Sequence, residues 1–207
     1  MNKRSICIAV IILFMAGFSE AQTGNRTQLS MQPESKLWLE GTSTMHEYSA
    51  RASQLLGTIV VDSMLFVEGE VDSSKLFQQV EVTIPVKMML SGNEKLDNNM
   101  YGALKVEDHP TITYQMTRDS IISVSKDSIT VRTTGKLAVA GKEKVIDMLV
   151  TILKNPDSTL SIKGSKELLM TEFNIEPPSM MFGLLKTDNK VVIHFALLVK
   201  AQQHVQQ

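Results

Sequence analysis

Apolar side chains at every second position are the feature that most constrains this 207-residue chain, and they dominate it from Ser35 onward. Successive side chains of a β-strand point to opposite faces, so a period of two predicts strands with one apolar face. Residues 80–86, for example, place Val80, Val82 and Ile84 on the same face. Alternating and continuous apolar runs of this kind predict strands over residues 36–41, 45–52, 57–62, 80–86, 111–117, 128–141, 143–154, 159–173 and 190–200.

The order of these segments indicates how the strands pair. They follow one another at hairpin spacing with one long helical segment among them, which argues for a single antiparallel sheet rather than for βαβ units. About eight such strands either close into a barrel or pack as a sandwich, and strands that are apolar on both faces favour the barrel. Gly135, in the middle of a long alternating segment, predicts a bend or bulge of the kind found where a sheet closes.

Two segments interrupt the alternation. Over residues 92–105, apolar side chains recur at positions i, i+4 and i+8, which predicts one amphipathic helix. Ser91 or Asn93 is available to cap the N-terminus of this helix. Residues 176–186 contain two consecutive prolines followed by a serine, and we expect a short helical cap there.

Residues 1–21 have the composition of a secretory signal peptide. Lys3 and Arg4 precede a short apolar run over residues 6–14, and small residues lead up to Ala21, after which we expect cleavage. An uncleaved membrane anchor is the alternative, but the run is shorter than the roughly 20 residues that span a bilayer. The protein is therefore expected to be exported, and to be periplasmic or secreted.

The rest of the chain fits one globular domain. Over all 207 residues, 43% are hydrophobic and 21% charged, which is ordinary for a folded protein, and the net charge of −1 argues against a nucleic-acid partner. Residues 22–34 are polar and aperiodic, so we expect a flexible segment there. The expected β-barrel domain covers residues 35–201, and residues 202–207 form a polar tail.

The sequence lacks catalytic and metal-binding patterns. Its one cysteine, Cys7, lies in the predicted leader, and its four histidines form no metal-binding motif, so we expect no metal site. A nucleophile elbow and Gly-rich phosphate loops are also missing. We therefore expect no catalytic residue and no enzyme. An enzyme that acts on lipids or uses a haem-like cofactor is the weakest alternative, and His109 and His194 are the residues that it would use.

Four stretches resemble elements of one protein family. They are GTSTMHEY at 41–48, MYGALK at 100–105 with HPTI at 109–112, GKLAVAGKEK at 135–144, and FNIEPPSMMFG at 173–183. Together they resemble the YceI-like family, lipocalin-like proteins that bind polyisoprenoids or related amphiphiles, although Tyr48 stands where this family commonly has Trp. The resemblance implies a long apolar pocket that holds an isoprenoid chain. The expected fold is all-β: one antiparallel lipocalin-like barrel of about eight strands, with one amphipathic helix and a short helical cap.

Methionine is the unusual item of the composition and suggests how a pocket is lined. The 13 Met outnumber the 7 Phe, 3 Tyr and 1 Trp together, and thioether side chains adapt to flexible apolar partners. The leading hypothesis is thus an exported carrier that holds an isoprenoid, quinone or fatty-acid-like amphiphile without catalysis. No cofactor is expected apart from such a ligand. The predicted ligand-binding residues are Trp38, Met100, Leu104, His109, Tyr114, Met116, Met181, Phe182 and Phe195.

A structural or adaptor domain of the cell envelope, with no small-molecule ligand, is the second hypothesis. It would bind a protein through exposed strands and the 176–183 segment, and a filled interior would favour it. For a carrier, the expected partners are a hydrophobic ligand and, in transient contact, a membrane surface. The sequence leaves the oligomeric state open, a dimer included.

Overall fold

The computed structural model describes residues 26–66, 75–180 and 185–202, and most of these residues lie in antiparallel strands. The strands are β1 (Arg26–Met31), β2 (Lys36–Ser43), β3 (Glu47–Ala52), β4 (Leu56–Asp62), β5 (Phe77–Pro85), β6 (Met89–Leu90), β7 (Thr111–Val124), β8 (Ser128–Val139), β9 (Lys142–Lys154), β10 (Thr159–Leu169), β11 (Ser179–Met180) and β12 (Leu185–Ala201). The helices are α1 (Glu94–Ala103) and the short 3₁₀ helices η1 (Ser63–Phe66), η2 (Val86–Met88) and η3 (Met170–Phe173).

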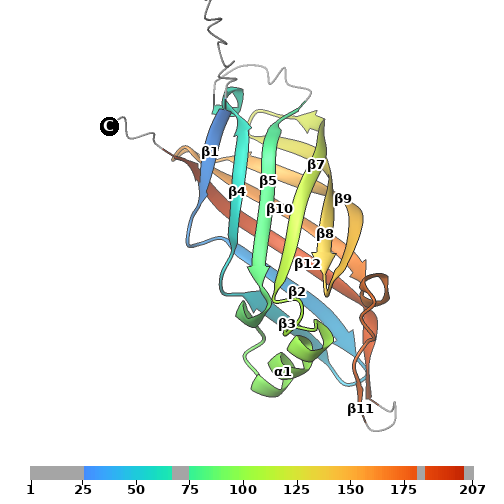
Figure 1. Ribbon diagram of the computed structural model, residues 1–207. Coiled ribbons are helices and arrows are strands. Elements are labelled where there is room, and N and C mark those ends of the chain that lie inside the picture. The colour runs from blue at the N-terminus through green and yellow to red at the C-terminus, as the bar shows by residue number, and fades with distance from the viewer. Residues whose placement is uncertain (1–25, 67–74, 181–184, 203–207) are drawn as a thin grey trace, which may run out of the picture.

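The sheet closes on itself. Among the described residues, β1, β4, β5, β7, β8, β9, β10 and β12 follow one another as hydrogen-bonded neighbours, and β12 pairs with β1 again (Figure 1). This ring of eight antiparallel strands confirms the predicted all-β barrel. β2, β3 and β6 extend the ring at one end, where β12 pairs with β2 and β3 pairs with β6. The long strand β12 therefore pairs with both β1 and β2 along the same edge.

The N-terminal strand corrects the expectation of a flexible segment over residues 22–34. Within it, Arg26–Met31 forms β1, which pairs with β4 on one side and with β12 on the other. Only Leu29 of this strand is fully buried, so the apolar alternation is too short to be recognised in the sequence. β1 is held by backbone pairing on both of its edges, and side-chain patterns do not record such pairing.

The one long helix agrees with its sequence signals. α1 occupies the predicted segment, and the Asn93 side chain accepts a hydrogen bond from the Leu96 amide at 3.1 Å as its N-cap. The expected helical cap over 176–186 is corrected, because Ser179 and Met180 form β11 and pair with the start of β12. Residues 181–184 lie outside the described residues. Prolines favour extended backbone before them, and here the Pro178 carbonyl accepts from the Thr187 amide at 3.0 Å.

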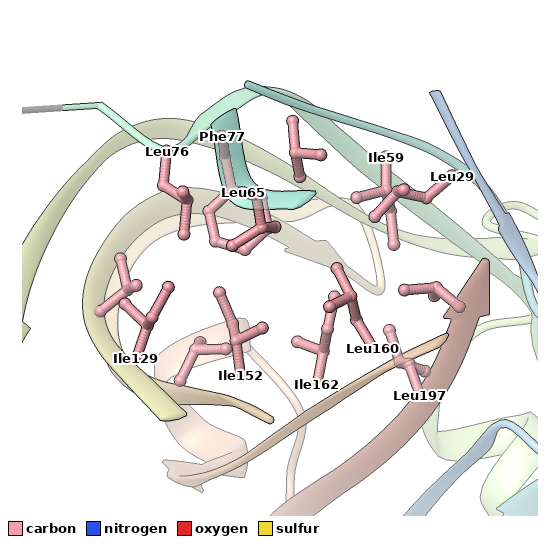
Figure 2. Close-up of a cluster of buried hydrophobic side chains, with 14 residues drawn as sticks. Leu29, Ile59, Leu65, Leu76, Phe77, Ile129, Ile152, Leu160, Ile162 and Leu197 are labelled. Carbon is pink, nitrogen blue, oxygen red and sulfur yellow. The ribbon is translucent and has the colours of Figure 1, made fainter. Parts of the chain in front are cut away.

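One end of the barrel is filled by side chains. Fourteen buried apolar residues meet there: twelve from the strands, one from η1 and one from just before β5 (Figure 2). Leu65 of η1 and Leu76 are at most 1% exposed, so this end is packed shut. Asp119, which is 6% exposed, holds the entry of β5, because its Oδ2 accepts from the amides of Leu76 and Phe77 at 2.7 and 3.2 Å.

Removing this carboxylate is expected to weaken the closed end. Asp119→Ala leaves the buried amides of Leu76 and Phe77 without an acceptor, which we expect to lower the free energy of unfolding by about 2–4 kcal/mol. Urea unfolding measures the change. Asp127→Ala, at an exposed position in the turn between β7 and β8, is the control and is expected to change stability by less than about 0.5 kcal/mol. Equal effects of the two substitutions would contradict this role of Asp119.

Candidate functional site

Below the packed end, the barrel encloses a cavity of about 640 Å³. Its wall is built from the alternate side chains that point inward along each strand, as the period of two requires. Residues of this kind include Leu137 of β8, Ile146 and Met148 of β9, and Ile193 of β12. Each of them is buried or half-buried, whereas their strand neighbours Val145 and Leu149 are exposed. The cavity is therefore the hollow part of the same interior whose other end is packed.

Helix α1 lies at the open end and contributes to the cavity wall (Figure 1). Leu96, Met100 and Ala103 of this helix line the cavity, as does its C-cap residue Leu104. Two contacts attach the helix to the strand region beside it. The Tyr101 hydroxyl donates to the Met89 carbonyl at 2.9 Å, and the carboxylate of Asp97 accepts from the Ser91 amide at 2.7 Å and from its hydroxyl at 2.6 Å.

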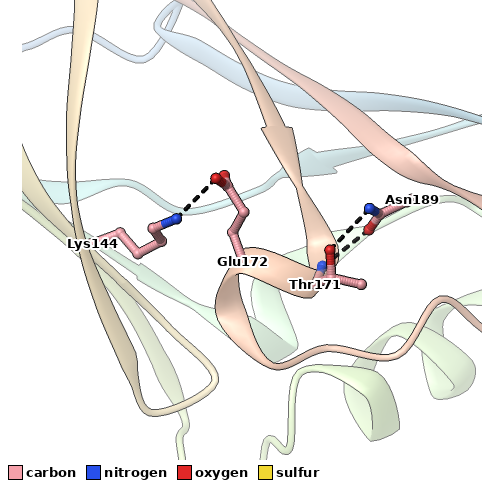
Figure 3. A network of polar contacts seen from close by, with 4 residues as sticks. All are labelled: Lys144, Thr171, Glu172 and Asn189. Atoms are coloured by element: carbon pink, nitrogen blue, oxygen red, sulfur yellow. Dashed lines mark hydrogen bonds and ion pairs between the residues drawn. The ribbon is translucent and has the colours of Figure 1, made fainter.

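The 3₁₀ helix η3 bridges two strands beside the open end. β9 and β10 pair only near the packed end. Beyond the point where these two strands diverge, η3 contacts β9 and β12. Lys144 of β9 binds Glu172 at 2.9 Å (Figure 3). The Asn189 side chain accepts from the Thr171 amide at 3.0 Å and donates to its hydroxyl at 2.9 Å (Figure 3). These contacts fix the buried Phe173 as part of the cavity wall.

Five of the nine predicted ligand-binding residues lie on the cavity wall: Met100, Leu104, Tyr114, Met116 and Phe195. They come from α1, β7 and β12, segments that are far apart in the sequence and that the barrel brings together. Met181 and Phe182 lie outside the described residues. Contact of the wall residues with a ligand stays a prediction.

Trp38 and His109 do not line the cavity. Trp38 lies on the outer face of β2, where its ring stacks on His194 at a centroid distance of 5.0 Å and its Nε1 donates to Glu40 at 2.9 Å. Its neighbours Leu37 and Leu39 take the inward positions, so the two faces of β2 are the reverse of what we expected.

The ring of His109 packs against the turn between β8 and β9. Its Nε2 lies 2.3 Å from where a Cβ on Gly141 would stand, and Gly141 has a φ of +79°. This turn therefore needs glycine both for its backbone conformation and for the imidazole. The arrangement joins the segment after α1 to the β8–β9 hairpin.

Three aromatic rings lie against glycines of the neighbouring strands. Tyr48 lies across Gly41, and the ring of Tyr114 lies against Gly135, where a Cβ would stand only 2.5 Å from it. Phe195 covers Gly164 in the same way. Glycine leaves room for each ring to lie along the wall, so the rings line the cavity without filling it. Gly135 pairs with Met116 of β7, and the register shift beside this pair lies in β7, between Met116 and Arg118.

The hydroxyls of Tyr48 and Tyr114 are polar atoms in this apolar wall. Both oxygens are buried and have no hydrogen-bond partner among the described residues. Burial, together with the charge of Asp188, raises the pKa of Tyr48 to about 12. Burial also raises the pKa of Tyr114, more than the neighbouring Thr133 hydroxyl lowers it. Both phenols therefore stay protonated at neutral pH and can donate a hydrogen bond.

Three charged residues of the wall were missed by the sequence analysis: Lys95, Lys166 and Lys186. No Asp or Glu is among the described residues that line the cavity. The signal for Lys166 was available, since it shares the even-numbered inward positions of β10 with Ile162 and Leu168. A lysine within a strand ordinarily lies on the solvent face, so only the alternation along β10 points to this inward position.

Two further features bear on the chemistry of the site. In the described part of the chain, no three His, Cys, Asp or Glu side chains come close enough together to hold a metal ion. The same residues include no helix with the length and apolar character needed to cross a membrane.

The geometry defines a class of protein: a closed antiparallel barrel, packed at one end and hollow at the other, with an apolar wall. Residues 32–199 match the YceI-like domain, and the chain belongs to this family. A search of curated proteins finds no match to the chain.

Solved structures with the same fold come from several bacteria. BcnA of Burkholderia cenocepacia is 17% identical with a TM-score of 0.63, and the match covers 82% of this chain and 99% of that one. A polyisoprenoid binding domain from Saccharophagus degradans, implicated in plant cell wall breakdown, is 13% identical with a TM-score of 0.62, over 84% and 98%. A YceI protein of Campylobacter jejuni is 15% identical with a TM-score of 0.55, over 75% and 85%. At these identities the likeness shows the fold.

The contact between Tyr114 and Gly135 can be tested by adding one methyl group. Gly135→Ala places a Cβ inside the ring's present position, so we expect a loss of about 1–3 kcal/mol in the free energy of unfolding, measured with urea. Gly102→Ala is the control, because a Cβ on Gly102 in α1 meets no atom within 4 Å, and it is expected to be neutral or stabilising. Tyr114→Leu combined with Gly135→Ala should recover part of the loss. A neutral Gly135→Ala would contradict the close approach.

The buried phenol of Tyr48 predicts a specific loss of stability in alkali. Its pKa is raised from 10.0 to about 12 by folding, so its neutral form is favoured in the barrel and its contribution to stability is complete below pH 10. The contribution disappears as the pH rises through about 12. Tyr48→Phe should therefore lose less stability than the unmodified protein between these pH values, as measured by urea unfolding. An equal loss in both proteins would show that Tyr48 ionises as freely as in the unfolded chain.

Proposed function

We propose that this protein is an exported, non-catalytic carrier that holds one long-chain amphiphile in its barrel cavity. The observation that carries the proposal is the cavity of about 640 Å³ with a predominantly apolar wall. This volume lies within the range of roughly 300–1,000 Å³ that is typical of small-molecule sites. The ligand class consists of isoprenoids, quinones and fatty-acid-like chains, all of which are long, narrow and apolar.

The energetics of such a ligand agree with this wall. Each CH₂ group moved out of water contributes roughly 0.8 kcal/mol, so ten groups supply about 8 kcal/mol before the cost of binding is subtracted. Six methionines adapt the wall to a flexible chain, and their thioethers repack without a fixed shape. They are Met45, Met89, Met100, Met116, Met148 and Met170.

The comparisons support the isoprenoid member of this class. The structural relative from Saccharophagus degradans is described as a polyisoprenoid binding domain, and its fold matches this chain with a TM-score of 0.62. The hollow interior also favours a carrier over an envelope adaptor domain, for which a filled interior is expected. The absence of catalysis is proposed because the two buried phenols stay protonated, and no carboxylate is among the described residues of the wall.

Export and membrane contact are further parts of the proposal. Export rests on the charged and apolar pattern of residues 1–21, which places the carrier in the periplasm or outside the cell. Transient contact with a membrane surface follows from the ligand, because so apolar a molecule has to be taken from a bilayer. Met45, at the tip of the β2–β3 hairpin and 68% exposed, lines the cavity at the end where such contact would occur.

Filling the cavity is expected to abolish this binding. In Ile146→Trp, the larger side chain takes the space of the ligand, and we expect affinity for farnesol and oleyl alcohol to fall about tenfold or more, equivalent to at least about 1.4 kcal/mol. Titration calorimetry on the purified protein measures the affinity. Val145→Trp is the matched control, since Val145 is the adjacent residue of β9 and is 64% exposed on the outer face.

A second measurement identifies the natural ligand and guards against misfolding. Mass spectrometry of an organic extract of the purified protein should find an isoprenoid, a quinone or a fatty acid, in smaller amount with Ile146→Trp than with Val145→Trp. Circular dichroism establishes that both variants are folded. A consistently empty barrel that gains no thermal stability from either alcohol would overturn the proposed function.

A further inference from the structure

Lys166 is a charged residue on the inner face of the barrel wall. It lies on β10, where the alternate positions Leu160, Ile162 and Leu168 are at most 7% exposed and belong to the interior. Lys166 lines the cavity together with Ile162 and Leu168. Its neighbours in sequence, Ser165 and Glu167, are exposed on the outside. The strand therefore directs a cation into an apolar cavity.

The nearby carboxylates are engaged elsewhere. Glu172 is bound by Lys144 at 2.9 Å (Figure 3), and this hydrogen bond, with a smaller contribution from the charge of Lys166, lowers the pKa of Glu172. Glu167 pairs with Lys190 at 3.3 Å. Within residues 26–66, 75–180 and 185–202, the ammonium group of Lys166 has no hydrogen bond and no ion pair. An ammonium group beside apolar side chains is costly unless it finds a partner.

The Tyr48 hydroxyl lies in the same region of the wall. Its oxygen is 2.3 Å from where a Cβ on Gly41 would stand, so it lies over β2. In the sheet, Gly41 pairs with Val191 of β12, and Lys166 of β10 pairs with the next inward residue of β12, Ile193. Since β12 separates β2 from β10, the two strands are two spacings apart, about 10 Å. The two side chains therefore flank one patch of the cavity surface.

The electrostatics of the wall favour negative charge. Lys95 of α1 and Lys186 of β12 also line the cavity, and both lie toward its open end. No Asp or Glu is among the described lining residues. The carboxylates whose charges reach this region, Glu172 and Asp188, lie off the lining and are bound by Lys144 and by the Thr42 hydroxyl. An anion that enters from this end passes two lysines before it reaches Lys166.

We propose that Lys166 binds the anionic head group, carboxylate or phosphate, of the amphiphile that the cavity holds, and that the Tyr48 hydroxyl donates a second hydrogen bond to it. This inference rests on the proposed function and adds the chemical class of the ligand, an acid rather than a neutral lipid. A charge-assisted hydrogen bond to a carboxylate or phosphate is about twice as strong as one between neutral groups. The apolar wall supplies affinity for the chain, and Lys166 supplies the preference for its head group.

Matched pairs of ligands distinguish the contribution of the head group to affinity from that of the apolar chain. Oleate is compared with oleyl alcohol, and farnesyl phosphate with farnesol, by titration calorimetry on the full chain, its Lys166→Met variant and its Lys163→Met control. Lys163 lies on the same strand but is exposed on the outer face. In the unmodified protein and the control, we expect at least one anion to bind roughly tenfold or more tightly than its alcohol. Lys166→Met should remove this preference, which is measured in each variant as the ratio of an anion's affinity to that of its own alcohol.

The outcomes distinguish this inference from the proposed function. A preference in the oleate pair alone identifies a carboxylate ligand, and one in the farnesyl pair alone identifies a phosphate. Tyr48→Phe should lower the affinity for the preferred anion several-fold relative to the affinity for its own alcohol. If the alcohols bind but neither anion binds more tightly, or if Lys166→Met keeps the preference, the inference is wrong and the apolar carrier stands. If none of the four ligands binds, both are overturned.

Discussion

The pairing of β1 with β12 is the interaction on which the rest of the structure depends. The register is short, with Leu29, Ser30 and Met31 opposite Ala201, Lys200 and Val199, yet it turns an open sheet into a barrel. Closure satisfies the backbone donors and acceptors of both edge strands and creates an inside face. In an eight-stranded barrel the interior is just wide enough for side chains or one small ligand. Whether side chains or a ligand occupy a given part of the interior depends on the size of the inward-facing residues at that height along the barrel axis.

This interior is divided along the barrel axis by the sizes of its side chains. At the packed end, leucines, isoleucines and valines from the strands meet Leu65 and Leu76, which come from the segment between β4 and β5. Toward the other end, glycine replaces a larger residue on three strands, and an aromatic ring of the next strand lies flat in the space. The packed end stabilises the fold, so the hollow end does not have to. A stability-determining core and an adaptable site thereby coexist in one small domain.

The period of two predicted most of the strands and the barrel, and the i, i+4, i+8 spacing predicted α1, because side-chain period and capping are local properties of the chain. The period of two did not predict β1, whose single buried residue, Leu29, leaves almost no pattern, nor the β11 pairing after two prolines. The inward face of a strand was uncertain for a similar reason: Trp38 and Leu39 are both apolar, and only the closed sheet decides between them. Lys166 was not among the predicted binding residues, although its position in β10 has the parity of the interior.

The outward position of Trp38 decides what ultraviolet spectroscopy can observe in this protein. It is the chain's single tryptophan, and its indole stacks on His194 at the outer surface. Its emission therefore reports the surroundings of the outer face of β2 more than the contents of the barrel. Tyr48 and Tyr114 are the chromophores that face the cavity, and their absorption is the intrinsic signal that senses what the interior contains. The molecule thus carries separate optical reporters for its two surfaces.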